Sequence, residues 1–416
     1  MSLSGRVGEH LENALETGQK KASSTVVLGI SAKSSSIVDF KGKNFDPETG
    51  EIFLEKVDFD PVQVRLERFA LQSASRRILR YSPVSRVARC LRARRFDKSQ
   101  IEVLKSKEHS SAHYGGLQTC ASVWTCPVCA AKISERRRME LLNAIAQHQK
   151  SGGQVLLLTL TNPHTASDCL QATLKAQALA MSRFNSNRSS KALFDGIGCI
   201  GTVRAWEVTH GVNGWHPHFH ILLFVSPGPY QVDYRHLFYL AWANACRLAG
   251  LPMPSEAHGV SLDDGSRAAE YASKWGLDQE MTKGHIKKAH KGATPFDFLR
   301  SYLRCDTDRL QAFAAARFLE YAKAFKGRRQ LVWSMGLKAL FDLGEVTDEE
   351  IAGHLDDQAF QLGKIELEDW RLILKFDARG DVLELARHGW ESVERLLSSL
   401  RASVHSMSSQ NEALQI

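Results

Sequence analysis

The sequence lacks the features that mark membrane, secreted and nucleotide-driven proteins. No run of about 18 apolar residues occurs, and the first residues are polar and charged rather than the apolar core of a signal peptide. The chain also has no Gly-x-x-x-x-Gly-Lys-Ser/Thr phosphate-binding loop and no internal repeat. We therefore expect a soluble protein of the cytoplasm that carries no nucleotide-driven motor of its own.

What the sequence does contain is a globular composition with an uneven charge. Hydrophobic residues make up 43% and charged residues 24% of the 416 residues, and this length predicts two or three folded units. Residues 345–416 hold 7 Lys and Arg against 15 Asp and Glu, whereas residues 1–344 hold 47 against 31. The first 344 residues are therefore the candidate for binding a polyanion, although a solvated lysine-rich surface explains mild basicity in many proteins.

Changes of composition and periodicity divide the chain into five segments. After Gly152-Gly153 strands alternate with helices, and a long hairpin is expected from 197–209 and 215–225, which predicts an α+β fold with an antiparallel sheet. We expect, in order, a flexible leader at 1–60, a basic helical and cysteine-containing module at 61–150, the α+β domain at 151–344, an acidic helical region at 345–402 and a disordered tail at 403–416.

The most informative stretch of the chain is Trp215–Phe224, which contains the run His-Pro-His-Phe-His. Side chains alternate across a strand, so His218 and His220 project from one face. Two imidazoles fixed side by side on a strand make half of a metal site. His216 shares this face but lies nearer the turn, so we expect it to support the site or to contact nucleic acid rather than to be a ligand.

The preceding strand supplies a third candidate ligand. If residues 211–214 form the hairpin turn, counting back from it places Glu207 opposite His218. Mixed imidazole and carboxylate ligation suits Mg²⁺ or Mn²⁺ when a phosphate completes the coordination shell. Glu207, His218 and His220 are therefore a candidate catalytic metal site, and the alternative is that these are ordinary, partly exposed strand residues.

A candidate nucleophile follows about fifty residues later, in a helix expected from about residue 265 to 275. Tyr271 and Lys274 are three residues apart and share a helix face. A phenol beside a cation ionises more readily, and a phenolate is a competent nucleophile toward a phosphodiester. Tyr-x-x-Lys alone is a weak motif, because a tyrosine packed in the core is the alternative. The motif therefore supports a nucleophile only in combination with the histidine strand, residues 215–224.

Cysteines cluster just before the α+β domain. In a reducing cytoplasm such a cluster indicates metal rather than disulfides. Cys126-Pro-Val-Cys129 is typical of one half of a zinc site, and Cys120 and Cys90 complete a tetrathiolate, which would be closed and structural. His113 is an alternative to Cys90 as the fourth ligand, and buried free thiols are the alternative to a zinc site.

Together, these motifs resemble those of rolling-circle replication initiators. The strand ending Leu158-Thr159-Leu160-Thr161, the histidine strand and Tyr-x-x-Lys follow one another in the order of the three motifs of that group, which belongs to the His-hydrophobic-His endonuclease superfamily. The resemblance covers roughly residues 80–340 and is strongest to bacterial plasmid replication proteins. It implies a central antiparallel sheet with flanking helices, here preceded by a small zinc-binding module and followed by an α-helical region.

The resemblance also implies a role for each matching residue. His218 and His220 match the ligands of the catalytic metal, Tyr271 the nucleophile, and Lys274 the residue that helps to position the phosphate. Attack by the tyrosine leaves a 5′-phosphotyrosine link and frees a 3′-OH, and a second transfer rejoins the strands at termination. The implied activity is metal-dependent, site-specific nicking and joining of single-stranded or hairpin origin DNA in the bacterial cytoplasm, with the helicase and DNA polymerase supplied by the host.

The sequence departs from parts of this family around the tyrosine. Some members carry a second Tyr four residues after the first, where this chain has Trp275, and others carry a Glu four residues before it, where this chain has Arg267. A single-tyrosine mechanism follows. Glu270, Asp263 and Asp264 are the candidates for activating water or a hydroxyl in the second transfer.

Basic side chains outside the three motifs are the further candidates for DNA contacts, with His216: Arg136, Arg137, Arg138, Arg328 and Arg329. A run of arginines on a helix is also typical of a plain solvated face. Two alternatives to a replication initiator stay open. A transposase of the same superfamily uses the same chemistry, and a non-catalytic zinc-containing DNA-binding regulator explains the charge and the cysteines but not the histidine strand.

Overall fold

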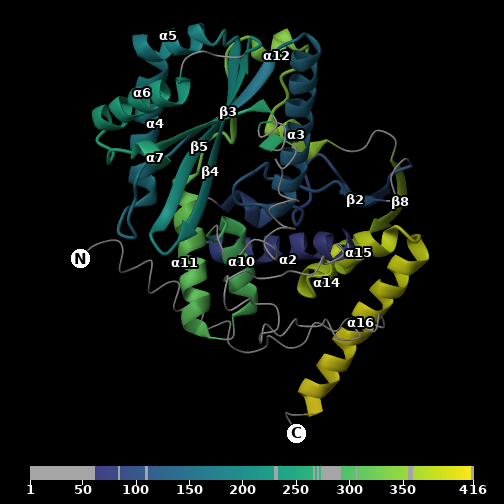
Figure 1. Cartoon of the computed structure of the whole chain (residues 1–416). Coiled ribbons are helices and arrows are strands. Elements are labelled where there is room, and N and C mark those ends of the chain that lie inside the picture. The colour runs from purple at the N-terminus through teal and green to yellow at the C-terminus, as the bar shows by residue number, and fades with distance from the viewer. Residues whose placement is uncertain are drawn as a thin grey trace, which may run out of the picture.

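The computed structural model describes residues 61–82, 85–107, 111–228, 233–265, 268, 271–272, 292–305, 307–354 and 359–413. The leader expected at 1–60 lies outside these residues. The described strands form two antiparallel sheets among helices, so the α+β class is confirmed (Figure 1). No helix among the described residues is long and apolar enough to cross a membrane.

The larger sheet has five strands in the order β6-β3-β5-β4-β7, and each neighbouring pair is antiparallel. β4 and β5 form the hairpin that the sequence predicts, with Gly211 opposite Gly214. The register of this hairpin pairs Glu207 with His218, as counting back from the turn predicts. The strands of this sheet are β3 (Gln154–Leu160), β4 (Gly201–Gly211), β5 (Gly214–Val225), β6 (Val260–Asp263) and β7 (Leu331–Trp333).

Different helices cover the two faces of this sheet (Figure 1). Phe219 and Ile221 of β5 enter a large core with α4, α6, α10 and α11, whereas Leu222 and Phe224 pack on the other face against α3 and α12. Because side chains alternate along a strand, His218 and His220 lie on the face that α3 and α12 cover. The helices of this half are α3 (Pro127–Lys150), α4 (Leu170–Ser186), α5 (Arg188–Gly196), α6 (Tyr234–Leu248), α7 (Glu256–Gly259), α10 (Pro295–Arg304), α11 (Asp308–Ala324) and α12 (Leu337–Leu340).

Some of these helices differ from the prediction. α3 begins at Pro127, which places Cys129 in its first turn. Proline at the first helical position is favourable because its missing N–H has no partner there. α5 and α10 are not predicted from the sequence. α10 nevertheless has a local start signal, since Asp297 accepts hydrogen bonds from the main-chain N–H and the hydroxyl of Thr294.

The smaller sheet joins the two ends of the described chain. Its order is β2-β1-β8, so a strand from the acidic C-terminal region pairs with a strand of the cysteine-containing module. Both regions contain the expected helices, and each also contains strands that the sequence does not predict. The elements of this half are α2 (Pro61–Leu79), the 3₁₀ helix η1 (Ser85–Arg89), β1 (Ile101–Lys105), β2 (Ala112–Gly115), α13 (Asp348–Gly353), β8 (Phe360–Ile365), α14 (Leu367–Lys375), α15 (Arg379–Ala386) and α16 (Trp390–Ala413).

A buried arginine links the elements around the smaller sheet to one another. The Arg379 side chain is fully buried, and its guanidinium donates to the Gln72 amide oxygen at 2.6 Å, the Ser73 hydroxyl at 2.9 Å and the Leu91 carbonyl at 3.2 Å. Its own carbonyl accepts a hydrogen bond from the Tyr114 hydroxyl at 2.8 Å. One residue of the C-terminal region therefore holds α2, β2 and the loop next to Cys90.

The C-terminal end also differs from the prediction. A disordered tail is expected from residue 403, but α16 continues to Ala413 and extends away from the rest of the protein (Figure 1). The sequence after 403 contains several Ser and an Asn, which lower helix propensity without breaking a helix that is already formed.

Candidate metal centre and active site

Three side chains of the β4–β5 hairpin converge on one point above the sheet. The Nε2 atoms of His218 and His220 lie 3.1 Å apart, and one carboxylate oxygen of Glu207 lies 3.5 Å from the first and 3.2 Å from the second. All three side chains are partly buried, and their ligand atoms face one another as the sequence predicts. Two imidazole nitrogens and a carboxylate form a donor set that fits a divalent cation with positions left for a ligand.

The electrostatics of Glu207 suit this arrangement. Burial raises the pKa of its carboxyl, but the neighbouring His220 and His218 outweigh that effect, so the pKa lies well below its usual range. Glu207 is therefore a carboxylate at neutral pH, which is the form that binds a cation.

The second ring nitrogen of each histidine, Nδ1, lies within hydrogen-bond distance of an oxygen of the protein. The Thr159 hydroxyl of β3 lies 2.9 Å from Nδ1 of His220, and the His216 carbonyl lies 3.3 Å from Nδ1 of His218. If each Nδ1 carries the proton, both Nε2 atoms keep a lone pair toward Glu207. This assigns a structural task to Thr159, which lies in the first of the three motifs.

The histidine strand is also held from the opposite face of the sheet. Gln177 of α4 is fully buried, and its amide nitrogen donates to the Pro217 carbonyl at 2.7 Å and to the Asn162 side-chain oxygen at 2.8 Å. Its amide oxygen accepts from the Trp206 indole at 3.2 Å. Pro217 lies between His216 and His218, so this buried hydrogen-bond cluster fixes the backbone that carries the imidazoles.

The structure brings Tyr271 to this centre. Its ring centroid lies 4.7 Å from that of His220, and its side chain packs against the core on the face that α3 covers. The flanking residues with predicted roles, Lys274 and Glu270, lie outside the described residues. Asp264 is described and exposed, and its main-chain carbonyl accepts a hydrogen bond from the Ala268 N–H at 3.1 Å. Asp263 is described: it pairs with Leu157 across β6 and β3, on the same face as Thr159.

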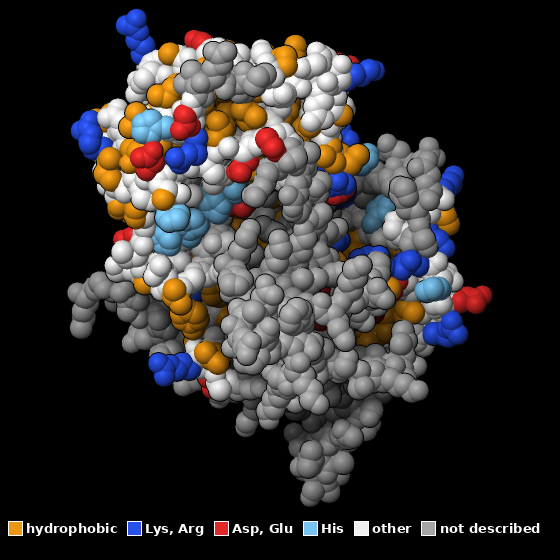
Figure 2. Space-filling view, viewed as in Figure 1, with side chains coloured by type: hydrophobic (Ala, Val, Ile, Leu, Met, Phe, Trp, Pro, Cys, Tyr) orange, Lys and Arg blue, Asp and Glu red, His pale blue; other side chains and the backbone are white. Residues whose placement is uncertain are grey.

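A further imidazole extends the centre toward solvent, and sequence reasoning missed it. His164 follows β3, and its Nδ1 lies 3.2 Å from Nδ1 of His216, whose ring stacks on that of His218 with centroids 4.9 Å apart. Figure 2 shows histidine side chains gathered in a strip over the part of the molecule where Figure 1 places β4 and β5. Burial, with His218 and His164 nearby, lowers the pKa of His216 to about 4, so it brings no positive charge to this strip at neutral pH.

The four cysteines form the second convergent group. Cys90 Sγ lies 3.4 Å from Cys129 Sγ and 3.7 Å from Cys126 Sγ, and Cys120 Sγ lies 3.8 Å from Cys129 Sγ. Four sulfurs bound to one zinc ion with bonds of about 2.3 Å lie about 3.8 Å apart, so the observed spacing fits a tetrathiolate. Among the described residues, the group that could hold a metal ion contains Cys90 and not His113.

Burial and mutual hydrogen bonding also fit a metal. All four cysteines are buried, and hydrogen bonds from Cys120, Cys126 and Cys90 hold the pKa of the Cys129 thiol well below its usual range. A thiolate among buried thiols is the chemistry of a metal ligand. The amide nitrogen of Gln72, on α2, donates to the Cys126 sulfur at 3.1 Å, so the group also anchors α2.

The predicted DNA-binding arginines of α3 are largely engaged within the protein. Arg137 donates to Glu140 at 3.0 Å and to Asp348 of α13 at 3.0 Å, and only 13% of its side chain is exposed. Arg138 pairs with Glu135 at 2.5 Å. Arg136 is the most exposed of the three, at 59%, and lies 3.7 Å from Glu140. Arg137 is therefore a link between α3 and α13 rather than a free surface cation.

The other two predicted arginines differ from each other. Arg328 lies over the Trp206 ring at 4.7 Å and donates to the Ala324 carbonyl at 3.0 Å, so it packs against the sheet. Arg329 is exposed.

Comparisons with known proteins agree with these features. The model of a family described as "Replication protein" matches residues 116–381. A "Protein rep" of Streptomyces lividans is 26% identical over an alignment of 358 residues, and the match covers 69% of this chain and 75% of that protein. A "Protein rep" of Lentilactobacillus hilgardii is 27% identical over 211 residues, or 50% of this chain and 64% of that protein.

A shorter match is to a "Neomycin resistance protein" of Streptomyces cyanogenus, which is 30% identical over an alignment of 136 residues, and the match covers 27% of this chain and 31% of that protein. No solved structure matches the chain. The family match spans three of the four clustered cysteines (all but Cys90), both strands of the hairpin and Tyr271. The family that the three motifs indicate is therefore confirmed, and the chain belongs to the replication protein family.

Proposed function

We propose that this protein initiates rolling-circle replication of a bacterial plasmid by nicking single-stranded origin DNA with Tyr271. The observation that carries the proposal is the placement of the Tyr271 ring 4.7 Å from His220, beside the convergent Glu207, His218 and His220. We further propose that residues 151–344 form a His-hydrophobic-His nuclease domain, because β5, the central strand of the sheet, carries both histidines.

The residues support the following chemistry. Glu207, His218 and His220 would hold Mg²⁺ or Mn²⁺, which polarises the scissile phosphate when it is bound. The Tyr271 oxygen, after losing its proton, attacks the phosphorus and forms a phosphotyrosine ester with the 5′ side, while the bond to the 3′ oxygen breaks and that oxygen takes up a proton. Because one ester replaces another, the link keeps the energy needed to rejoin strands, and the free 3′-OH is available to a host DNA polymerase.

The cysteine group has a separate task in this proposal. Cys90, Cys120, Cys126 and Cys129 would hold a structural Zn²⁺, which fastens the start of α3 to α2 and to the loop at residue 90. In this role the protein would work with a host helicase in the bacterial cytoplasm. A transposase would use the same residues, so the test of chemistry comes first.

The test of chemistry is a covalent adduct on a denaturing gel. A labelled single-stranded origin oligonucleotide is incubated with Mn²⁺ and the full chain, the Tyr271→Phe variant or a matched Tyr239→Phe variant of α6. We expect adduct with the wild type and with Tyr239→Phe, and none with Tyr271→Phe, because only the attacking oxygen is lost. Adduct formation by Tyr271→Phe at the wild-type level would refute the proposed nucleophile.

The metal ligands need their own test. His218→Ala and His220→Ala are each expected to abolish Mn²⁺-dependent cleavage while oligonucleotide binding persists. Binding without adduct in the wild type under every divalent metal would favour the non-catalytic regulator instead.

A further inference from the structure

A cavity of about 780 Å³ lies in the half of the protein that does not carry Glu207, His218 and His220, the histidine centre. It is enclosed by α2, β2, the start of α3, α13 and α15, together with the loop that follows Cys90. Its volume falls in the range of sites that bind small molecules or one or two nucleotides. Neither the family motifs nor the cysteine group assigns a ligand to it.

The charge of the lining favours an anion. Each of the three carboxylates on the cavity wall is bound to an arginine: Glu384 to Arg65 at 2.8 Å, Glu349 to Arg86 at 3.3 Å and Glu135 to Arg138 at 2.5 Å. These acidic groups are therefore already neutralised within the protein.

The remaining cations of the wall come from three separate elements. Lys132 of α3 donates to the main-chain carbonyls of Ala352 and His354 rather than to a carboxylate, and Lys98 is exposed. Arg68 of α2 also lines the cavity beside Arg65, and burial is the main cause of its lowered pKa. An anion in the cavity would be attracted to these cations.

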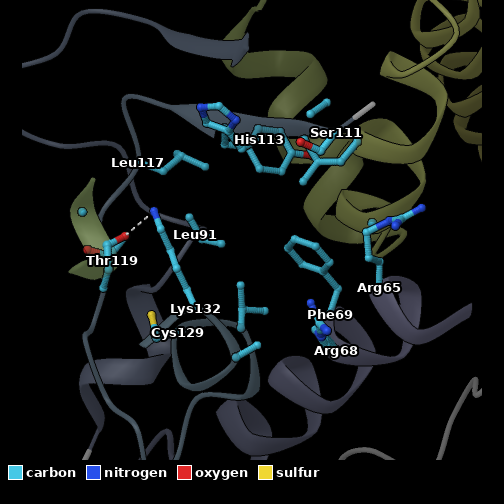
Figure 3. A pocket seen from close by; sticks show the side chains of 18 of the residues that line it. Arg65, Arg68, Phe69, Leu91, Ser111, His113, Leu117, Thr119, Cys129 and Lys132 are labelled. Atoms are coloured by element: carbon cyan, nitrogen blue, oxygen red, sulfur yellow. Dashed lines mark hydrogen bonds between the residues drawn. The ribbon is translucent and has the colours of Figure 1, made fainter. Parts of the chain in front are cut away.

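The cavity also offers an apolar surface between these cations. Figure 3 shows the Lys132 side chain on one side and the Phe69 ring on the opposite side, with Leu91 and Leu117 along the wall and Arg65 beyond the ring. An aromatic ring and aliphatic side chains flanked by cations are what a nucleotide requires, because its base is planar and apolar on its faces and its phosphate is anionic.

We propose that this cavity is a second nucleic-acid site, which binds a nucleotide of single-stranded DNA with its base against Phe69 and its phosphate near Lys132. This proposal rests on the proposed function for the identity of the polymer, but it uses none of the residues of the histidine centre. Such a site would hold the strand at a distance from Tyr271 and would add affinity without taking part in cleavage.

The first experiment measures binding of a labelled single-stranded oligonucleotide by fluorescence anisotropy. All proteins are the full chain and carry Tyr271→Phe, so that no cleavage occurs, and chelators are avoided to preserve the cysteine group. Lys132→Glu and Lys98→Glu are compared with Lys191→Glu, which makes the same change of charge on an exposed residue of α5.

We expect Lys132→Glu to weaken binding about tenfold and to reduce the slope of log affinity against log salt by about 0.7, the value for one lost phosphate contact on a single strand. Lys98→Glu should shift both quantities in the same direction, and Lys191→Glu should leave both near the parent values. Equal affinities and slopes for all three variants, with unchanged circular dichroism, would overturn the proposal.

A second experiment locates the strand. An oligonucleotide containing 5-iododeoxyuridine is photocrosslinked to the protein, which is then digested with trypsin. We expect the crosslink in the peptide of residues 69–76, which begins with Phe69, and its loss in Lys132→Glu. Crosslinks confined to peptides of β4, β5 and residues 268–274 would refute the second site. Protection of the 69–76 peptide by free dTMP, with oligonucleotide affinity unchanged in Lys132→Glu, would show that the ligand is a free nucleotide and not a DNA strand.

The two proposals fail separately. Absence of a tyrosine adduct in the wild type does not alter binding by the Tyr271→Phe proteins, and unchanged binding in the lysine variants does not affect nicking.

Discussion

Replacing Thr159 with valine tests how the proposed metal site is held in place. The substitution keeps the shape of the side chain and removes only the hydroxyl, which lies 2.9 Å from Nδ1 of His220 on the neighbouring strand. Without that acceptor, the Nδ1–H group of a partly buried ring loses its partner, which costs about 1–3 kcal/mol. The tautomer with the proton on Nε2 then becomes more favourable, and that proton occupies the lone pair that faces Glu207 and His218.

This cost predicts the size of the effect. A penalty of about 1–3 kcal/mol corresponds to a loss of affinity of roughly 5- to 150-fold, which matches the usual effect of removing a partner of a metal-bound histidine. We therefore expect Thr159→Val to weaken Mn²⁺ binding about 10- to 100-fold while the free energy of unfolding changes by less than about 2 kcal/mol.

Titration calorimetry with Mn²⁺ provides the measurement. Thr159→Ser keeps the hydroxyl and is expected to restore most of the affinity. Thr202→Val is the matched control, because Thr202 of β4 pairs with Leu223 and so lies on the other face of the same sheet. If Thr159→Val binds Mn²⁺ as tightly as Thr202→Val does, the hydroxyl does not orient His220 and the argument fails.

Three further predictions test the rest of the structure. Cys126→Ser is expected to lose one equivalent of zinc in metal analysis and to lower the urea midpoint, whereas Cys169→Ser, at an exposed cysteine, should change neither. Arg379→Met should destabilise the protein by about 3 kcal/mol in urea unfolding, because it leaves buried hydrogen-bond partners unsatisfied, and the same change at exposed Arg371 should cost less than about 0.5 kcal/mol. Glu207→Gln keeps the size of the side chain but removes its charge, so we expect Mn²⁺ affinity to fall at least about tenfold in the same calorimetric assay, and unchanged affinity would exclude Glu207 as a ligand.

The hairpin could be predicted from the sequence because its geometry is local. A strand has a period of two residues, and a turn fixes the register of the strands that it joins, so the spacing of Glu207, His218 and the turn determines which side chains meet. The position of Tyr271 could be expected only from the order of the motifs. No local rule predicts it, because the contact with His220 is made between separate elements across the sheet face.

The support of the centre could not be predicted in the same way. Thr159, Gln177 and His164 reach the histidine strand from a neighbouring strand, a helix and a loop, and each contact depends on how separate elements pack. A single sequence gives the propensities of those elements but not their pairing. The short strands β1, β2 and β8 could not be predicted either. Each has only four to six residues and becomes stable only when the sheet is assembled.

The assembled sheet also changes what the uneven charge means. Composition suggests a basic part that binds DNA and an acidic part with a task of its own. In the structure, acidic residues of the C-terminal region are partners of arginines from the cysteine-containing module, through the pairs Arg65–Glu384, Arg86–Glu349, Arg92–Asp377 and Arg137–Asp348. Part of the positive charge is therefore paired with carboxylates within the protein. The net charge of a segment overstates the number of cations that DNA can reach. The cations left available to DNA in our proposal are those whose neighbours are main-chain carbonyls or solvent, such as Lys132 and Lys98.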